Sequence, residues 1–179
     1  MAGDEKRYMV MTAVGADRPG LIERVATLIH AAGANLEDSR MAILGGEFAV
    51  ILLFSGDARA VEAVIKQQPM LESELGLQTT VRSTARQTKA TDYLPYELRI
   101  NGVDRPGIVA RVTSVLASRK VNVAALESRV GYAPLSGTPL FLLEAQLQVP
   151  SEVALATLRT ELSRVCDEEN LDFQLDSRR

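Results

Sequence analysis

The sequence has little of the chemistry that most catalytic or metal sites need. Among 179 residues there is one cysteine, one histidine and no tryptophan. A single cysteine, Cys166, cannot form a disulfide within the chain, which fits a reducing compartment. With His30 as the one histidine, neither a His/Cys metal cage nor a Cys–His nucleophile pair is available. We therefore expect no catalytic residues, no metal site and no cofactor.

Long hydrophobic runs are also missing. No apolar stretch approaches the roughly 18–20 residues that a membrane-spanning helix needs. The first ten residues, MAGDEKRYMV, carry both charge signs and lack the apolar core of a signal peptide. These absences predict a cytoplasmic protein with no membrane partner.

The charge balance argues against direct contact with nucleic acid. The formal net charge is −3, with 10 Lys/Arg and 11 Asp/Glu in residues 1–90 and 10 and 12 in residues 91–179. Proteins that grip nucleic acid present a basic stripe that neutralises phosphates, and neither half is basic. Hydrophobic residues make up 46% and charged residues 24%, as in ordinary globular proteins. We expect a globular protein that does not bind nucleic acid directly.

What the sequence does contain is an internal repeat. The segment Gly15–Leu21 (GADRPGL) recurs as Gly102–Ile108 (GVDRPGI), an offset of 87. At the same offset Arg24-Val25 returns as Arg111-Val112. Because polar and turn residues recur together with apolar ones, chance is a poor explanation. The period is too long for one solenoid unit of ~20–50 residues, so it indicates two copies of a small domain.

The first copy predicts the order strand, helix, strand, strand, helix, strand. Apolar residues within 21–32 recur at helical spacing, and Gly33 is placed to end that helix. Gly45-Gly46 predicts a two-residue hairpin, because both central positions of a type I′ turn need positive φ. Pro69 ends or kinks the second helix. The expected strands are 8–14, 36–44, 47–55 and 77–81, and the expected helices are 21–32 and about 57–68.

The second copy repeats this order with a longer hairpin. Ser55 or Asp57 suits the cap of the second helix in the first copy, and Ser151 suits it in the second. The expected strands of the second copy are 96–103, 121–130, 140–149 and 171–175, and its helices are 108–117 and 151–167.

A βαββαβ unit of ~70–80 residues folds as a ferredoxin-like domain, a four-stranded antiparallel sheet with both helices on one face. We therefore predict an α+β protein with two such domains, residues 6–84 and 93–176. The segment 85–92 has almost no large apolar residue and is expected to be a linker. Small domains bury little surface, so we expect their open faces or edges to pack together or in a dimer.

The repeated Asp-Arg-Pro-Gly tetrapeptide is the candidate site. Proline suits the first helical position, and an aspartate just before it can accept bonds from amides of the first turn. The glycine leaves the backbone uncovered at the positive end of a helix, which favours an anion such as a carboxylate. The same tetrapeptide is also a good helix start with no ligand at all.

An asparagine opens the next strand in each copy. We expect Asn35 and Asn122 to lie near the same end of the sheet as the tetrapeptide, where an amide can both donate to and accept from an amino acid. An asparagine that only stabilises a turn after a helix is the alternative.

These features resemble the ACT domain, a small amino-acid-sensing module: a strand, Asp-Arg-Pro-Gly, an amphipathic helix, then Asn-Leu or Asn-Val leading into a hairpin. The resemblance covers residues 6–84 and 93–176. It implies a ligand site at the first strand–helix turn, often shared between two ACT units across an interface. The positions that match by motif are Asp17, Arg18, Pro19, Gly20, Leu21 and Asn35, and Asp104, Arg105, Pro106, Gly107, Ile108 and Asn122.

A free-standing pair of this size also resembles ACT-family regulators of transcription. That resemblance implies a non-enzymatic repressor that responds to glycine or another small amino acid and acts through a DNA-binding activator. We expect a homodimer. Tandem ACT modules also serve enzymes, so a regulatory subunit of an amino-acid-metabolism enzyme is the alternative. The longer hairpin loop, residues 131–139, is a partner contact, a lid or a tolerated insertion.

Overall fold

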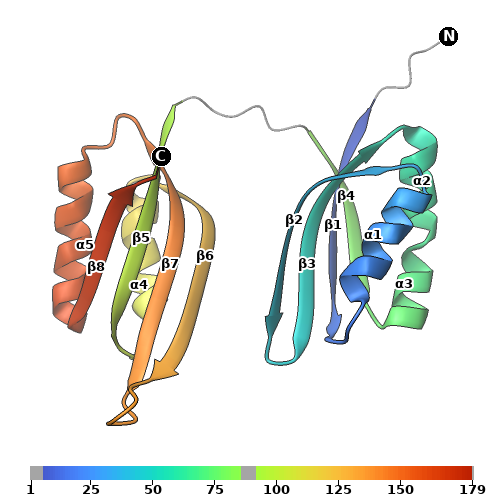
Figure 1. Cartoon of the computed structure of the whole chain (residues 1–179). Coiled ribbons are helices and arrows are strands. Elements are labelled where there is room, and N and C mark those ends of the chain that lie inside the picture. Colours follow the sequence, from blue (N-terminus) through green and yellow to red (C-terminus); the bar gives the residue numbers. More distant parts are fainter. Residues whose placement is uncertain (1–5, 86–91, 179) are drawn as a thin grey trace. The chain divides into compact units, whose positions relative to one another are not determined.

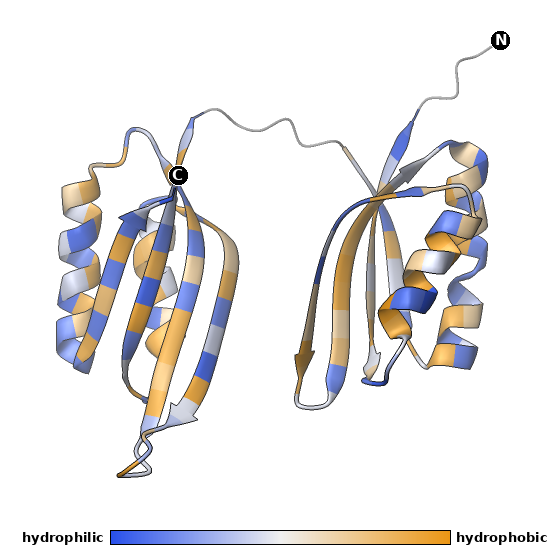
Figure 2. Ribbon diagram, in the orientation of Figure 1, coloured by the Kyte–Doolittle hydropathy of each residue, from blue (hydrophilic) through white to orange (hydrophobic). Residues whose placement is uncertain are grey.

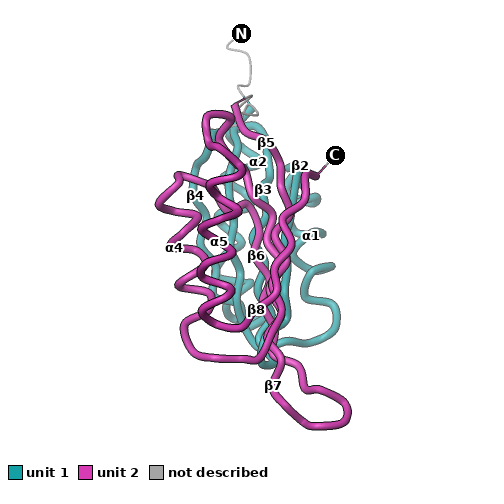
Figure 3. The backbone as a smooth tube through the Cα atoms, turned by 90° about the vertical axis from the view of Figure 1, so that its left-hand side faces the viewer, with its two compact units in different colours: residues 1–88 teal, residues 89–179 magenta. Residues whose placement is uncertain are grey.

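The sequence repeat becomes two structural units. A computed structural model describes residues 6–85 and 92–178, and the chain divides into unit 1, residues 1–88, and unit 2, residues 89–179 (Figure 3). Residues 86–91 of the predicted linker 85–92 lie outside the described residues.

Unit 1 is an antiparallel sheet with its helices on one face (Figure 1). Its strands lie in the order β2-β3-β1-β4, so the first strand is central and the hairpin strand β2 is at one edge. The elements of unit 1 are β1 Arg7–Ala16, α1 Leu21–Ala31, β2 Asn35–Leu44, β3 Glu47–Gly56, α2 Ala58–Lys66, α3 Gln68–Leu75 and β4 Gln78–Thr84.

Unit 2 repeats this topology with strand order β6-β7-β5-β8. Its two helices also lie on one face of the sheet (Figure 1). The elements of unit 2 are β5 Tyr93–Val103, α4 Ile108–Ser118, β6 Asn122–Tyr132, β7 Pro139–Pro150, α5 Leu155–Glu169 and β8 Leu171–Ser177. Two four-stranded antiparallel sheets of βαββαβ type confirm the predicted fold class.

The turn glycines behave as their positions predict. Gly45 and Gly46 both have positive φ, 61° and 86°, as a type I′ hairpin requires. Gly33 follows α1 at φ 81°. In unit 2 the equivalent residue is Lys120, which adopts φ 57° although it has a side chain. Each first helix therefore ends on a left-handed residue, whether or not that residue is glycine.

The second helix of unit 1 differs from the prediction. It breaks at Gln67 into α2 and α3, and Pro69 lies in the first turn of α3. Proline has no N–H and its ring clashes with the carbonyl four residues earlier, so the helix restarts there. Of the two candidate caps, Asp57 is the one that acts, accepting from the backbone N–H of Ala60 at 2.7 Å. The cap expected at Ser151 is wrong, because α5 begins only at Leu155.

Each unit has its own hydrophobic core between sheet and helices. Alternate residues of the central strands, such as Met11 and Leu52 in unit 1 and Ile100 and Leu143 in unit 2, are fully buried against the helices. All the buried residues of one core lie between positions 9 and 77, and all those of the other between 98 and 175. The other face of each sheet is the side that its own helices do not cover (Figure 1).

Candidate ligand site

The Asp-Arg-Pro-Gly segment forms the turn between the first strand and the first helix of each unit. Gly20 has φ 94° and ψ −4°, and Gly107 has φ 94° and ψ −3°. Glycine adopts this left-handed conformation without the steric cost of a Cβ atom. Helices α1 and α4 then begin at Leu21 and Ile108. The repeat in sequence is therefore a repeat of local backbone structure.

Two details of the turn correct the prediction. Pro19 is not the first helical residue, because the left-handed Gly20 stands between it and the helix, and Pro106 is placed in the same way. No side-chain bond caps either helix, so Asp17 and Asp104 do not act as caps. Instead, the backbone N–H of Asp17 donates to the Gly46 carbonyl at 2.9 Å. The chain stays attached to the hairpin up to the aspartate and turns only afterwards.

The first glycine of the repeated segment has a packing role. A Cβ atom on Gly15 would lie 2.5 Å from the carbonyl oxygen of Gly76. In unit 2 a Cβ on Gly102 would lie 2.5 Å from a methyl carbon of Leu171 and 3.0 Å from the carbonyl oxygen of Asn170. Both glycines allow the first strand to approach the start of the last strand. Their recurrence needs no ligand.

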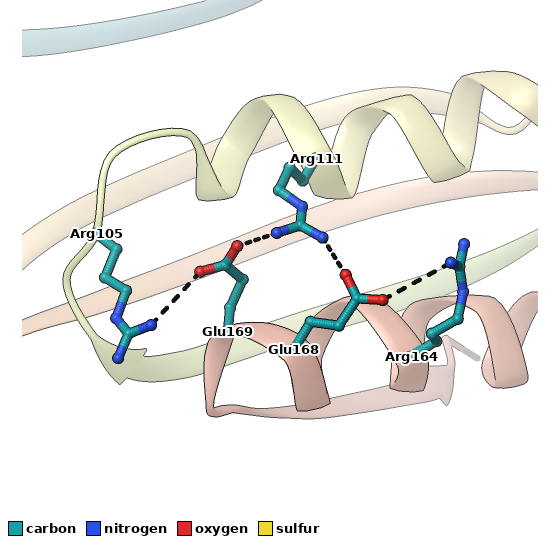
Figure 4. A network of polar contacts seen from close by, with 5 residues as sticks. All are labelled: Arg105, Arg111, Arg164, Glu168 and Glu169. Carbon is teal, nitrogen blue, oxygen red and sulfur yellow. Dashed lines mark hydrogen bonds and ion pairs between the residues drawn. The ribbon is translucent and has the colours of Figure 1, made fainter.

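The arginine of each motif reaches the end of the last helix of its unit. Arg18 Nη2 donates to the carbonyl oxygen of Glu74 at 2.9 Å, near the C-terminus of α3, where a positive charge is favourable. Arg105 Nη1 lies 4.0 Å from the carboxylate of Glu169 at the end of α5 (Figure 4). Both arginines therefore connect the turn to the neighbouring helix.

A second arginine, one turn into the first helix, completes this connection. Arg111 forms ion pairs with Glu168 and Glu169, and these contacts, that with Glu168 first, raise its pKa (Figure 4). Its counterpart 87 residues earlier, Arg24, lies 3.5 Å from the carboxylate of Glu74. Each unit thus holds its turn against the end of its last helix with two arginines.

What remains for a ligand at the turn is backbone. Leu21 and Ile108 are buried in the cores, so their side chains anchor the helix. The first helical hydrogen bonds run from the N–H groups of Arg24 and Arg111 to the carbonyls of Gly20 and Gly107. The N–H groups of the preceding helical residues point out of the helix start and can donate to an anion.

The asparagines lie elsewhere, which corrects the sequence-based expectation. The register pairs Asn35 with Ser55, and Ser55 with Tyr8 near the start of β1, whereas the turn follows the end of β1 at Ala16. Asn122 likewise pairs with Gln148, at the opposite end of its sheet from the turn. The reason is that the intervening helix runs back along the sheet, so β2 begins where β1 begins. Within one unit, neither asparagine meets the tetrapeptide.

Family models identify both units. Residues 7–82 match one model described as ACT domain, and residues 96–159 match another.

The chain belongs to the ACT-domain family.

Relatives with two such units extend the likeness to almost the whole chain. This tandem ACT-domain protein is 28% identical over 170 residues to the glycine cleavage system transcriptional repressor of Escherichia coli (strain K12), covering 95% of this chain and 90% of the relative. The repressor of the same name from Shigella flexneri matches equally.

Solved structures agree. A protein of unknown function from Galdieria sulphuraria has a TM-score of 0.82 at 32% identity, covering 98% of this chain and 100% of that one. A structure assigned provisionally as a glycine cleavage system transcriptional repressor has a TM-score of 0.72 at 28% identity, covering 96% and 97%.

The first ACT unit also holds a polar cluster that sequence analysis missed. Ser55 is only 1% exposed, and its Oγ donates to Glu37 Oε1 at 2.5 Å. Lys6 Nζ lies 2.8 Å from the same oxygen and 5.4 Å from the centre of the Tyr8 ring. Hydrogen bonds from Lys6, Ser55 and Asn35 lower the pKa of Glu37 to about 2. The strand register shifts at Glu37, and nothing in the sequence marks this bulge.

Other candidate chemistry is not supported in the described part of the chain. Cys166 is buried, and burial with neighbouring acids raises its thiol pKa to about 11, so it is no nucleophile at neutral pH. Among residues 6–85 and 92–178 there is no group of three potential metal ligands and no helix long and apolar enough to cross a membrane. A hollow of about 380 Å³ lies between α1 and α2–α3, and no residue of the tetrapeptide lines it.

Proposed function

We propose that this tandem ACT-domain protein is an amino-acid-sensing regulator that represses transcription of a glycine cleavage system. One observation carries the proposal: the similarity to a named repressor runs through both ACT units and covers 90% of that relative. The same similarity favours this role over that of a regulatory subunit of an enzyme. It also supports a non-enzymatic, cytoplasmic protein.

The proposed ligand is a small amino acid, with glycine as the first candidate. Its carboxylate would accept hydrogen bonds from the first-turn amides of α1 or α4, where the helix dipole adds to the attraction. Asp17 and Asp104, four residues before those helices, offer a carboxylate to the ligand ammonium group. A methyl group added at Gly20 or Gly107 would meet no atom within 4 Å, so the approach to the amides is open.

The other motif residues would act by positioning. Arg18 and Arg105 hold the turn against the last helix, Pro19 and Pro106 restrict its backbone, and the apolar residues that follow anchor the helix. Since Asn35 lies at the opposite end of its own sheet, an asparagine could complete a site only on the turn of a different ACT unit. The same holds for Asn122.

The proposed output is a protein–protein contact. The net charge of −3 leaves no excess of basic residues for gripping DNA, so repression would pass through a DNA-binding activator. A homodimer is part of the proposal.

Isothermal titration with a panel of amino acids, glycine first, tests the sensing role. We expect heat of binding and a rise in melting temperature for glycine or a similarly small amino acid. No heat and no thermal shift for any member of the panel would overturn the sensing role.

Affinity purification with and without the bound amino acid tests the output. We expect the tagged protein to retain a DNA-binding activator, in an amount that changes with the amino acid. Recovery of a metabolic enzyme in its place would favour the regulatory-subunit role and contradict the proposal.

A further inference from the structure

The two units differ in the sheet face that their own helices leave uncovered, here called the open face. In unit 1, alternate residues of β1 and β3 such as Met11 and Leu52 point to the helices, so the residues between them lie on the open face. Figure 2 shows β3 as hydrophobic along most of its length, whereas β5 of unit 2 alternates between hydrophobic and hydrophilic residues. Unit 1 is therefore apolar on both sides of its sheet.

Strand register arranges the open face of unit 1 in rows across the four strands. The central positions are apolar or carry a hydroxyl, and Ile51 at the centre is 50% exposed. Charged residues lie only at the two margins, on β2 and β4. Read from β2 through β3 and β1 to β4, the rows are Asp38, Leu53, Val10 and Arg82; Arg40, Ile51, Thr12 and Thr80; and Ala42, Ala49, Val14 and Gln78.

Unit 2 shows that the fold does not require this apolar centre. Thr12 pairs with Ile51, and the residue 87 positions later, Arg99, pairs in the same way with Glu144. Arg99 also forms an ion pair with Glu97 at 2.8 Å. The same place on the same fold is thus charged in unit 2 and apolar in unit 1. An exposed apolar patch that the fold does not demand is typical of an interaction surface.

We propose that the open face of unit 1 is the surface through which two copies of the chain associate, each covering the same face of the other. The face spans four strands and about eight residue steps, which at ~4.8 Å and ~3.3 Å gives roughly 19 Å by 27 Å. Two such faces bury roughly 1,000 Å² before the relief of side chains is counted, which reaches the lower limit of a specific interface. Sheets that pack face to face in this manner are common in folded proteins.

The charges at the margins match a second copy. A two-fold axis parallel to the strands, between β3 and β1, lays β2 of one copy over β4 of the other and leaves each row over itself. Asp38 of one copy then faces Arg82 of the second copy, twice by symmetry, because both residues belong to one row. Ile51 falls over Thr12 of the second copy, with no charge buried in the centre. An identical face is therefore complementary in both shape and charge.

Analytical ultracentrifugation of the full chain, without amino acid, tests this interface independently of the proposed ligand site. Ile51→Glu gives unit 1 the residue that unit 2 carries at the equivalent place, so the fold accepts it. We expect it to weaken the dimer by roughly tenfold to a hundredfold, as the loss of a central interface residue does. Glu144→Gln is the matched control in unit 2 and should leave the dimer unchanged.

A charge exchange identifies the axis and does not depend on Ile51. We expect Asp38→Arg and Arg82→Asp each to weaken the dimer, and the double variant D38R/R82D to restore it. A wild-type chain that stays monomeric, a dimer that Ile51→Glu leaves intact, or a double variant weaker than both single variants would each overturn the proposal. Circular dichroism confirms that each variant is folded.

Discussion

Replacing Gly20 by alanine separates the backbone role of the turn from its role as a ligand site. Gly20 has φ 94°, so an alanine there must adopt a left-handed conformation that costs about 1–2 kcal/mol. The new methyl meets no atom within 4 Å, so no clash adds to that cost. For a unit of this size we expect the melting temperature of unit 1 to fall by roughly 4–16 °C, with the fold retained.

The same methyl stands where the ligand carboxylate would approach the first-turn amides. Loss of one charge-assisted hydrogen bond is worth about 1.5–3 kcal/mol, or a weakening of roughly 10- to 150-fold in affinity. Calorimetric titration with glycine at a temperature where the variant is folded measures this change. Gly107→Ala makes the same test at the turn of unit 2.

Gly33→Ala is the matched control for strain. Gly33 also has a left-handed φ, 81°, and a methyl there would make only an ordinary contact at 3.9 Å with Ala60 Cβ. It should lower the melting temperature of unit 1 to a similar extent and leave glycine affinity unchanged. Equal affinity in the wild type, Gly20→Ala and Gly107→Ala, with all three folded, would refute the assignment of the site to these turns.

Three further outcomes follow from the contacts. Gly102→Ala should destabilise unit 2 by about 1–3 kcal/mol in urea, since its methyl would overlap Leu171, whereas Gly131→Ala, which meets nothing, should be neutral. The depressed pKa of Glu37 stabilises unit 1 above the ordinary value of 4.5, and this contribution is lost as the pH falls toward about 2; the stability difference between wild type and Glu37→Gln should therefore shrink over that interval, and a constant difference would contradict it. Cys166 should resist a thiol reagent in the native protein and react in denaturant; rapid native labelling would show that it is accessible.

The elements of this chain could be predicted because local signals mark them. Gly45-Gly46 fixes a hairpin through positive φ alone, and Gly33 ends a helix for the same reason. The repeat doubled the evidence for each element. Where a local signal was ambiguous the prediction was less complete: Pro69 marked the end of α2 but gave no indication that α3 would follow it at once.

The arrangement of the candidate site depended on direction and register, which single residues do not encode. Asn35 was expected beside the turn, but α1 runs the length of the sheet before β2 begins, which puts the asparagine at the far end. Arg18 was expected in the site, but its partner, the carbonyl of Glu74, is 56 residues away along the chain. The buried bond between Ser55 and Glu37 likewise depends on a bulge that only the strand pairing reveals.

The two separate cores have a practical consequence for calorimetry. Because each core takes all its buried residues from one unit, each unit can melt as a transition of its own. A ligand stabilises only the folded form to which it binds, by an amount that grows with its concentration relative to the dissociation constant. A single thermogram recorded with and without glycine would then act as an internal address label: the peak that moves names the unit that holds the ligand.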